Sequence, residues 1–117
     1  MMEQEKNTEG SVSTVEQKLI EGQVIEAIRT CYDPEIPVNI YELGLIYGVN
    51  VDGQGNVVIN MTLTTPHCPA AQSLPGEVER KAKAVPGVRN AKVDIVWYPP
   101  WNPSMMTEAA RLELGMQ

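Results

Sequence analysis

The chain has 117 residues, a length that suits one domain with an adequate hydrophobic core. Its formal net charge is −6, from nine basic and fifteen acidic residues, and no basic cluster is interleaved with aromatic residues. This balance argues against a nucleic-acid-binding protein. No apolar run approaches the ~20 residues that cross a membrane, and the polar residues 1–6 lack the apolar core of a signal peptide. We therefore expect a cytoplasmic protein that binds neither nucleic acid nor membrane.

The cysteine and histidine content limits the metal sites that the chain can build. Cys31, Cys68 and His67 are the only residues of these two types. A reducing compartment argues against a structural disulfide between the two cysteines. Two cysteines and one histidine do not complete a closed four-ligand zinc site in one chain without carboxylates. A soft-metal site would therefore have to be open, or be completed by a second chain or a partner.

The first part of the chain divides into a tail and a helix. Residues 1–12 are polar and predict a disordered tail, so the folded domain is expected over residues 13–117 as a single unit. Ser13 and Glu16 have the spacing of a capping box, which predicts the start of a helix. Apolar residues then recur at roughly helical spacing: Val15, Leu19, Val24, Ile25, Ile28 and Cys31. We interpret Cys31 as the last apolar position of this helix.

A stiff acidic loop follows over residues 33–38. Pro34 and Pro37 push the residues before them out of the helical region and so end the helix. Asp33 and Glu35 lie two residues apart in this loop. One interpretation is helix termination together with solubility. The other is a fixed pair of acids that binds a cation or orients a neighbouring group, and the residues alone leave both open.

Two strands joined by a turn are expected next. Residues 39–44 connect to a strand over 45–51, and the Gly-rich cluster 52–56 predicts a β-hairpin turn into a second strand over 57–64. The core face of the second strand is expected to carry Val57, Ile59, Met61 and Leu63, and its partly solvated face Val58, Asn60, Thr62 and Thr64.

The second strand runs into the segment that carries Cys68. Pro66 stops the strand, Cys68 lies between Pro66 and Pro69, and the composition after Pro69 favours a helix. Free N–H groups and the positive end of the helix dipole would favour a thiolate at this place. Such a thiolate is a nucleophile or a soft metal ligand. The alternative is a buried and inert cysteine, which is a common state of free cysteines.

A helix over residues 70–85 and a strand over 88–97 come next. Pro75 and Gly76 should bend or restart the helix, with Ser73 as a second N-cap. The inner stripe of the helix is expected to be Leu74, Val78, Ala82 and Val85, and the core face of the strand Ala91, Val93, Ile95 and Trp97.

Residues 97–103 have the most unusual composition in the chain, with three aromatic residues and three prolines. This loop is interpreted either as a lid over the edge of the core or as a partner-docking surface that includes Trp101, because aromatic residues are enriched at interface anchors. Asn102 and Pro103 then resemble an N-cap and a first helical position. They predict a short final helix to about Leu114, with Met105, Ala109 and Leu112 on its inner stripe.

The predicted order is helix–strand–strand–helix–strand–helix, which indicates an α+β fold: a small mixed three-stranded sheet packed with helices on one face. The hairpin is antiparallel. The third strand returns after a helical crossover and should therefore pair in parallel with one of the first two.

Several of these segments together resemble a known family. The segments that carry the resemblance are Asp33-Pro34-Glu35-Ile36-Pro37-Val38-Asn39-Ile40-Tyr41-Glu42-Leu43-Gly44-Leu45-Ile46-Tyr47, Met61-Thr62-Leu63-Thr64 and Cys68-Pro69. They resemble the metal–sulfur cluster biosynthetic family, which contains SufT, the PaaD-like proteins and the eukaryotic MIP-eighteen proteins. The later segment Val96-Trp97-Tyr98-Pro99-Pro100-Trp101-Asn102-Pro103, followed by Met106-Thr107-Glu108-Ala109-Ala110-Arg111-Leu112, is most similar to the SufT branch.

The resemblance covers about Val24 to Gly115 and implies an accessory role in iron–sulfur cluster assembly or in the maturation of iron–sulfur proteins. It implies that Cys68 is the functional thiol, and a transient ligand of iron or of a cluster. It also implies a supporting loop around that thiol, formed by Asp33, Glu35, Thr64 and Thr65. The resemblance assigns no role to Cys31 or His67.

Four hypotheses follow for the function. The leading one is a factor that is not an enzyme and that docks the iron–sulfur assembly machinery and apo client proteins. One thiolate per chain is too few for a four-cysteine cluster site, although a homodimer would supply two. The runner-up is a PaaD-like component of a multisubunit oxygenase system. The third is a thiol-dependent enzyme with Cys68 as nucleophile, and the fourth is an interaction module in which Cys68 is inert.

Overall fold

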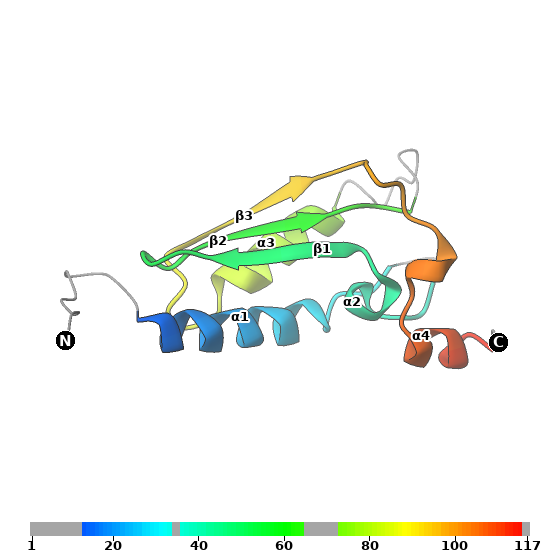
Figure 1. Ribbon diagram of the computed structural model, residues 1–117, viewed down its shortest axis with the longest axis horizontal. Helices are drawn as coiled ribbons and strands as arrows, with labels where there is room; N and C mark the ends of the chain where they lie inside the picture. Colours follow the sequence, from blue (N-terminus) through cyan, green and yellow to red (C-terminus); the bar gives the residue numbers. More distant parts are fainter. Residues whose placement is uncertain (1–12, 34–35, 65–72, 116–117) are drawn as a thin grey trace.

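The computed structural model describes residues 13–33, 36–64 and 73–115. A three-stranded sheet is covered on one face by two helices, and the remaining short helices gather at one end of the sheet (Figure 1). The elements are α1 (Thr14–Ile28), α2 (Ile40–Leu43), β1 (Ile46–Val51), β2 (Asn56–Met61), α3 (Leu74–Lys83), β3 (Asn90–Ile95), the 3-10 helix η2 (Pro103–Met105) and α4 (Glu108–Glu113). The expected α+β class and element order are confirmed, with α2 and η2 as short additions. In these ranges no helix is long and apolar enough to cross a membrane.

The sheet is mixed, with β2 in the centre. β1 and β2 are antiparallel, from Val51↔Val57 at the turn to Ile46↔Met61 at the other end. β3 pairs in parallel with β2, from Asn56↔Asn90 to Met61↔Ile95, after the crossover through α3. The prediction of a parallel third strand is therefore confirmed.

The core lies between the sheet and the two long helices. The inward residues of β2 alternate as expected, with Val57, Ile59 and Met61 almost fully buried. The predicted inner stripe of α3 is also buried: Leu74, Val78, Ala82 and Val85. Each large aliphatic side chain in such a place contributes about 1.5–3 kcal/mol through removal from water.

Helix α1 begins at the predicted capping box but buries a different face. The Ser13 hydroxyl accepts from the Glu16 amide at 3.1 Å, and the Glu16 carboxylate accepts from the Ser13 amide at 3.1 Å. Val15 and Leu19, which belong to the apolar series found in the sequence, do not lie on the buried face, because they are 70% and 60% exposed. The buried stripe is Ile20, Val24 and Ile28, a row at spacing i, i+4 that packs against the sheet and α3.

Helix α2 corrects the expectation that residues 39–44 are only a connection. The Asn39 side chain accepts from the Glu42 amide at 2.9 Å and caps the helix. Gly44 ends it in the left-handed conformation, with φ of 89°. An N-cap asparagine and a terminal glycine were both visible in the sequence, but the helix is only one turn long.

Several side chains lie in other surroundings than expected. Thr62 is buried instead of partly solvated, and Trp97 is 48% exposed instead of facing the core. Asn102 caps a 3-10 helix, because its side chain accepts from the Ser104 amide at 2.9 Å. The final α-helix starts later, with Thr107 as its N-cap, and buries Met106 and Ala110. The predicted inner stripe is therefore wrong: Ala109 and Leu112 are exposed, and Met105 belongs to η2.

The start of the second long helix is described only in part. α3 runs from Leu74, with Ser73 at its N-cap position and Pro75 in its first turn. Whether a helix precedes it and is bent or restarted here stays a prediction. Ser73 makes no capping hydrogen bond with its side chain. The expected beginning at residue 70 and the predicted disordered tail 1–12 lie outside the described residues.

Candidate functional site

The predicted site residues that the structure describes, Asp33, Thr64 and Trp101, lie in segments at one end of the sheet. β2 and β3 both point toward the end where α2, η2 and α4 lie (Figure 1). We call this region, residues 29–33, 36–45 and 97–113, the α2 end. Thr64 follows β2 there and is half-buried. Cys68, Glu35 and Thr65 fall outside the described residues, so the predicted approach of the acidic loop to the thiol stays a prediction.

Asp33 starts the acidic loop as a buried carboxylate, only 6% exposed. Its Oδ1 accepts from the Ile36 amide at 3.2 Å. The two ends of the loop are joined, because the Ile40 amide donates to the Cys31 carbonyl at 2.9 Å and Tyr32 forms a β-bridge with Asn39. The residues on either side of the loop are therefore hydrogen-bonded to each other, and the Asp33 carboxylate is buried at its start. A buried carboxylate does little for solubility, so the arrangement favours the interpretation that Asp33 orients neighbouring groups.

Glu42 is a central residue of the α2 end that sequence reasoning did not identify. Its carboxylate forms an ion pair with Arg29 at the end of α1 and accepts from the Thr107 hydroxyl. Its carbonyl oxygen accepts from the Thr107 amide at 2.9 Å. Arg29 is further held over the Tyr41 ring, 4.7 Å from its centroid. One carboxylate thus joins α1, α2 and the N-terminus of α4. The Asn39-x-x-Glu42 spacing is the only local signal for it.

We call residues 97–103 the aromatic loop. Two long-range hydrogen bonds fix it to the rest of the protein. The Trp101 indole N–H donates to the Leu43 carbonyl at 2.8 Å, and the Tyr47 hydroxyl donates to the Pro99 carbonyl at 2.7 Å. Trp101 packs against the core, so the expectation that Trp97 is buried and Trp101 is the more exposed is wrong. The exposed rings are those of Trp97 and Tyr98, at 48% and 87%.

Gly44 allows the end of α2 to approach η2 closely. A methyl group at its Cα position would overlap the carbonyl group of Met105. Together with its positive φ, this contact explains why glycine stands between Leu43 and Leu45.

Cys31 is a buried thiol with no sign of a reactive environment. It lies just beyond the end of α1 and is fully buried. Burial raises the pKa of its thiol, and the nearby Glu77 carboxylate raises that pKa further, while Lys81 opposes the change. The thiol is therefore neutral and unreactive at neutral pH. The interpretation of Cys31 as the last apolar position of the first helix is therefore wrong about the helix, which ends at Ile28, although the side chain is buried in the core.

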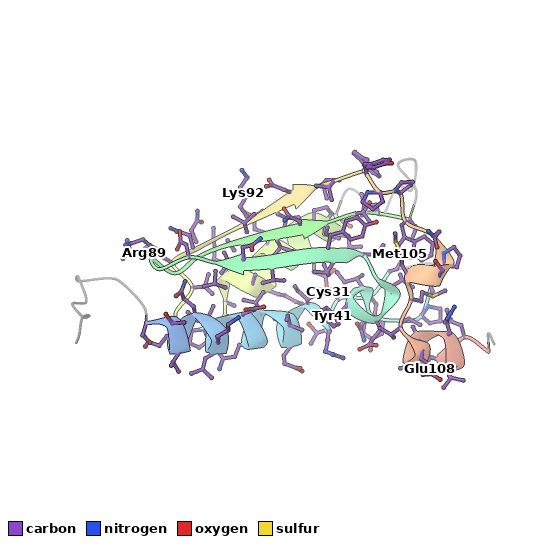
Figure 2. The ribbon with its side chains drawn as sticks, in the orientation of Figure 1. Cys31, Tyr41, Arg89, Lys92, Met105 and Glu108 are labelled. Carbon is purple, nitrogen blue, oxygen red and sulfur yellow. The ribbon has the colours of Figure 1, made fainter. Side chains whose placement is uncertain are left out.

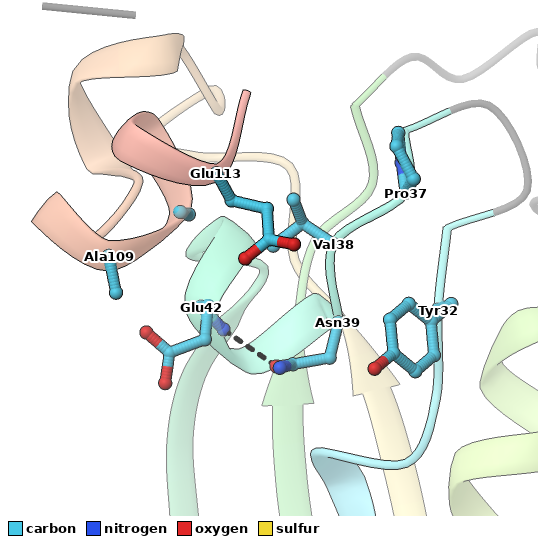
Figure 3. Close-up of a pocket in the computed structure, with 8 residues that line it drawn as sticks. Tyr32, Pro37, Val38, Asn39, Glu42, Ala109 and Glu113 are labelled. Carbon is cyan, nitrogen blue, oxygen red and sulfur yellow. Dashed lines mark hydrogen bonds between the residues drawn. The ribbon is translucent and has the colours of Figure 1, made fainter. Parts of the chain in front are cut away.

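A small hollow lies between the acidic loop, α2 and α4 (Figure 3). Its volume is about 100 Å³. Its lining residues are Tyr32, Pro37, Val38, Asn39, Glu42, Ala109, Ala110 and Glu113. In the described parts of the chain, no group of three or more histidine, cysteine or acidic side chains is arranged to hold a metal ion.

The comparison with known proteins extends over the same elements. The family model described as iron–sulfur cluster assembly protein matches residues 21–95, from within α1 to the end of β3. The chain belongs to this iron–sulfur cluster assembly family. The match includes the acidic loop and the segment around Cys68, whereas the aromatic loop and α4 lie beyond it.

Relatives within the iron–sulfur cluster assembly family cover most of the chain. The chain is 50% identical over 95 residues to an Fe-S protein maturation auxiliary factor of Porphyromonas gingivalis, which is 81% of this chain and 90% of that protein. It is 39% identical over 84 residues to the Fe-S protein maturation auxiliary factor SufT of Staphylococcus aureus, covering 72% of this chain and 96% of SufT. The similarity to the SufT branch is therefore confirmed.

The fold is also similar to that of a solved member of unknown function. A domain of unknown function from Bacillus anthracis has a crystal structure that matches with a TM-score of 0.82 at 34% identity. The match covers 90% of this chain and 100% of that one.

Proposed function

We propose that this protein is an accessory factor in the maturation of iron–sulfur proteins, working in the cytoplasm with the assembly machinery and apo client proteins. The observation that carries the proposal is the 50% identity, over 95 residues, to a protein named as a maturation auxiliary factor. The relatives are named as auxiliary factors. The proposal accordingly assigns docking and transfer to this chain, and no catalytic residue.

Cys68 is the functional thiol in this proposal and a transient ligand of iron or of a cluster. It follows β2, whose end points toward the α2 end with its buried Asp33. The other cysteine, Cys31, is buried, with a raised pKa, and is a poor ligand for that reason. Asp33, Glu35, Thr64 and Thr65 would support the thiol. Clusters are normally held by four protein ligands, so one chain would bind its cargo weakly, and a homodimer or a client would complete the site.

Docking in this proposal uses the aromatic loop, whose side chains have two roles. Trp101 fixes the loop to the Leu43 carbonyl, and Tyr47 of β1 fixes it through Pro99. Trp97 and Tyr98 are exposed and can contact a partner. A loop that is already fixed loses little conformational entropy on association. Trp101→Ala should lower both client maturation and the free energy of unfolding. Tyr98→Ala should lower maturation alone, and unchanged maturation in both variants would return the loop to the role of a lid.

The role in maturation is tested in cells that lack the gene. The measurement is the specific activity of an iron–sulfur enzyme at equal enzyme protein, after complementation with wild type, Cys68→Ser or Cys31→Ala. We expect loss of most of the client activity with Cys68→Ser and retention with Cys31→Ala, the matched cysteine control. Full client activity without the gene would contradict the accessory role. Full activity with Cys68→Ser would contradict the role of the thiol.

Weak cargo binding is tested by anaerobic reconstitution with iron and sulfide. We expect substoichiometric iron on the wild type, lost on addition of excess competing thiol, and none above background on Cys68→Ser. A stable stoichiometric cluster on a monomer would contradict the view that a second chain or client completes the site.

A further inference from the structure

The hollow between the acidic loop and α4 has the chemistry of a cation-binding pocket. One wall is the ring of Tyr32, which is 55% exposed, and another is the carboxylate of Glu113 (Figure 3). Figure 3 shows this carboxylate directed from α4 toward Val38, across the hollow from Tyr32. Val38 and Ala110 contribute apolar surface, and Asn39 and Glu42 contribute polar surface. A tyrosine face, a carboxylate and an apolar floor are the groups that hold an ammonium or guanidinium with its methylene stem.

The same end of the protein already holds one cation with this pair of groups. Arg29 lies over the Tyr41 ring and forms an ion pair with the Glu42 carboxylate. Tyr32 and Glu113 present the same two chemical groups in the hollow, and within the described residues Glu113 has no ion pair. Glu42, which also lines the hollow, is already paired with Arg29 and accepts from Thr107, so its charge is largely compensated and Glu113 is the carboxylate left for a further cation.

Glu113 also stands at a place where local rules disfavour it. It is the last residue of α4, and the free carbonyl groups at a helix C-terminus favour basic side chains there. A negative side chain in such a position raises the negative potential of the hollow. A cation bound beside Glu113 would relieve this local conflict, and residues that break a local rule are often found at functional sites.

The size of the hollow suits a small group. Its volume of about 100 Å³ is enough for the charged head of one side chain. The chain as a whole carries a net charge of −6, which steers positively charged partners toward it.

We propose that the hollow lined by Tyr32, Val38 and Glu113 is a docking pocket for a single arginine or lysine side chain of a partner protein. The α4 wall lies beyond the residues that the family model matches, so the pocket is assigned from this structure alone. This inference rests on the proposed role in partner docking. It does not depend on Cys68.

The test is an NMR titration of the full chain at low salt with N-acetyl-arginine methylamide, N-acetyl-lysine methylamide and the neutral citrulline analogue. We expect saturable shifts of the backbone amides around Asn39, Ala109 and Glu113, with a millimolar dissociation constant for one of the two cationic probes. Citrulline should bind at least about fivefold more weakly, because it has the shape of arginine without the charge.

Two variants locate the binding. Glu113→Gln should weaken the binding about two- to fivefold, which is what a single exposed charge pair contributes at low salt. Glu79→Gln, the same change on α3 outside the hollow, should leave it unaltered. The pocket would be overturned by citrulline binding as tightly as the cationic probes, by shifts that spread over the whole surface, or by a dissociation constant that is unchanged in Glu113→Gln. These measurements do not involve client maturation, so a failure here is distinct from a failure of the proposed function.

Discussion

The two ends of the sheet are held together in different ways. At the hairpin end, the Asp52 carboxylate accepts hydrogen bonds from the amides of Gln54 and Asn56 at 2.8 and 2.9 Å, all within one turn of chain. At the α2 end, Glu42 joins Thr107, and Trp101 joins Leu43, across more than fifty residues of sequence. The hairpin turn is therefore held mainly by contacts between neighbouring residues, whereas the α2 end depends on contacts between distant segments.

This difference has a consequence for function. Polar contacts between distant segments fix the acidic loop, α2 and the aromatic loop as one unit, so a change in one of them is transmitted to the others. Residues proposed to act on partners, such as Tyr98 and Glu113, lie on that unit. The hairpin end has two longer-range hydrogen bonds, from the Arg89 amide to the Gly55 carbonyl and from the Gln17 side chain to the Val51 carbonyl, but these do not involve the α2 end. The hairpin end is therefore expected to tolerate substitution without loss of maturation activity.

The largest effect is expected from Gly44→Ala at the α2 end. The substitution places a Cβ on a residue with positive φ and against the Met105 carbonyl, so we expect a loss of about 2–4 kcal/mol in the free energy of unfolding. Urea denaturation followed by circular dichroism measures it.

Gly22→Ala is the matched control for that prediction. Gly22 lies in α1 with no atom close to the added methyl group, so alanine there should stabilise the protein by about 0.5–1 kcal/mol. Equal destabilisation by both substitutions would show that close packing at Gly44 is not the cause.

The second effect concerns Glu42→Gln, which keeps the shape and removes the charge. We expect a loss of about 1–2 kcal/mol in the free energy of unfolding, because Arg29 loses its ionic partner in a half-buried place. Amide hydrogen exchange should accelerate in α4, which Glu42 holds through Thr107.

Glu26→Gln is the control for the Glu42 variant. Glu26 is an exposed partner of the same arginine at 3.6 Å, and its loss should cost no more than about 0.5 kcal/mol. Exchange in α4 that is as fast in this variant as in Glu42→Gln would contradict the role of Glu42 as the tie to that helix.

A smaller effect is expected from Tyr47→Phe, which removes the hydroxyl that donates to Pro99. The expected loss is about 0.5–1.5 kcal/mol, with faster exchange of the amides in the aromatic loop. Tyr98→Phe removes a hydroxyl from a ring that is 87% exposed and should change neither quantity. Loop exchange that is unaltered by Tyr47→Phe would mean that Trp101 alone fixes the loop.

Local signals in the sequence predicted the elements that local contacts hold. The capping box at Ser13, the hairpin turn at 52–56, the alternation in β2 and the inner stripe of α3 all agree with the structure. Each depends on periodicity or on side chain–backbone bonds between near neighbours. The class of function came from the resemblance to the family, because hydrophobic periodicity predicts elements and not function.

The features that sequence reasoning missed depend on tertiary contacts. Trp97 and Trp101 are equally apolar, and only the Leu43 carbonyl decides that Trp101 turns inward. α4 buries Ala110 in place of Leu112, because it is held at its N-terminus by Glu42. Glu42 has no periodic signature. The arrangement around Cys68 stays a prediction, since that segment lies outside the described residues.

The last and smallest effect is a pH dependence at the hairpin end. Hydrogen bonds from the Asn56 backbone and side chain hold the pKa of Asp52 below its ordinary value, because they stabilise the ionised carboxylate. A folded-state pKa below the unfolded-state pKa means that the stabilising contribution is complete above the unfolded-state pKa. It is lost as the pH falls through the folded-state pKa.

Carboxyl chemical shifts recorded by NMR between neutral and acidic pH should therefore show Asp52 titrating below the ordinary value for an aspartate. In Asp52→Asn, the stability should lose this part of its pH dependence, while hydrogen exchange in α4 and client maturation stay as in the wild type. Slower client maturation or faster hydrogen exchange in α4 in Asp52→Asn would contradict this expectation. Either result would show that the two ends of the sheet are coupled through β1 and β2.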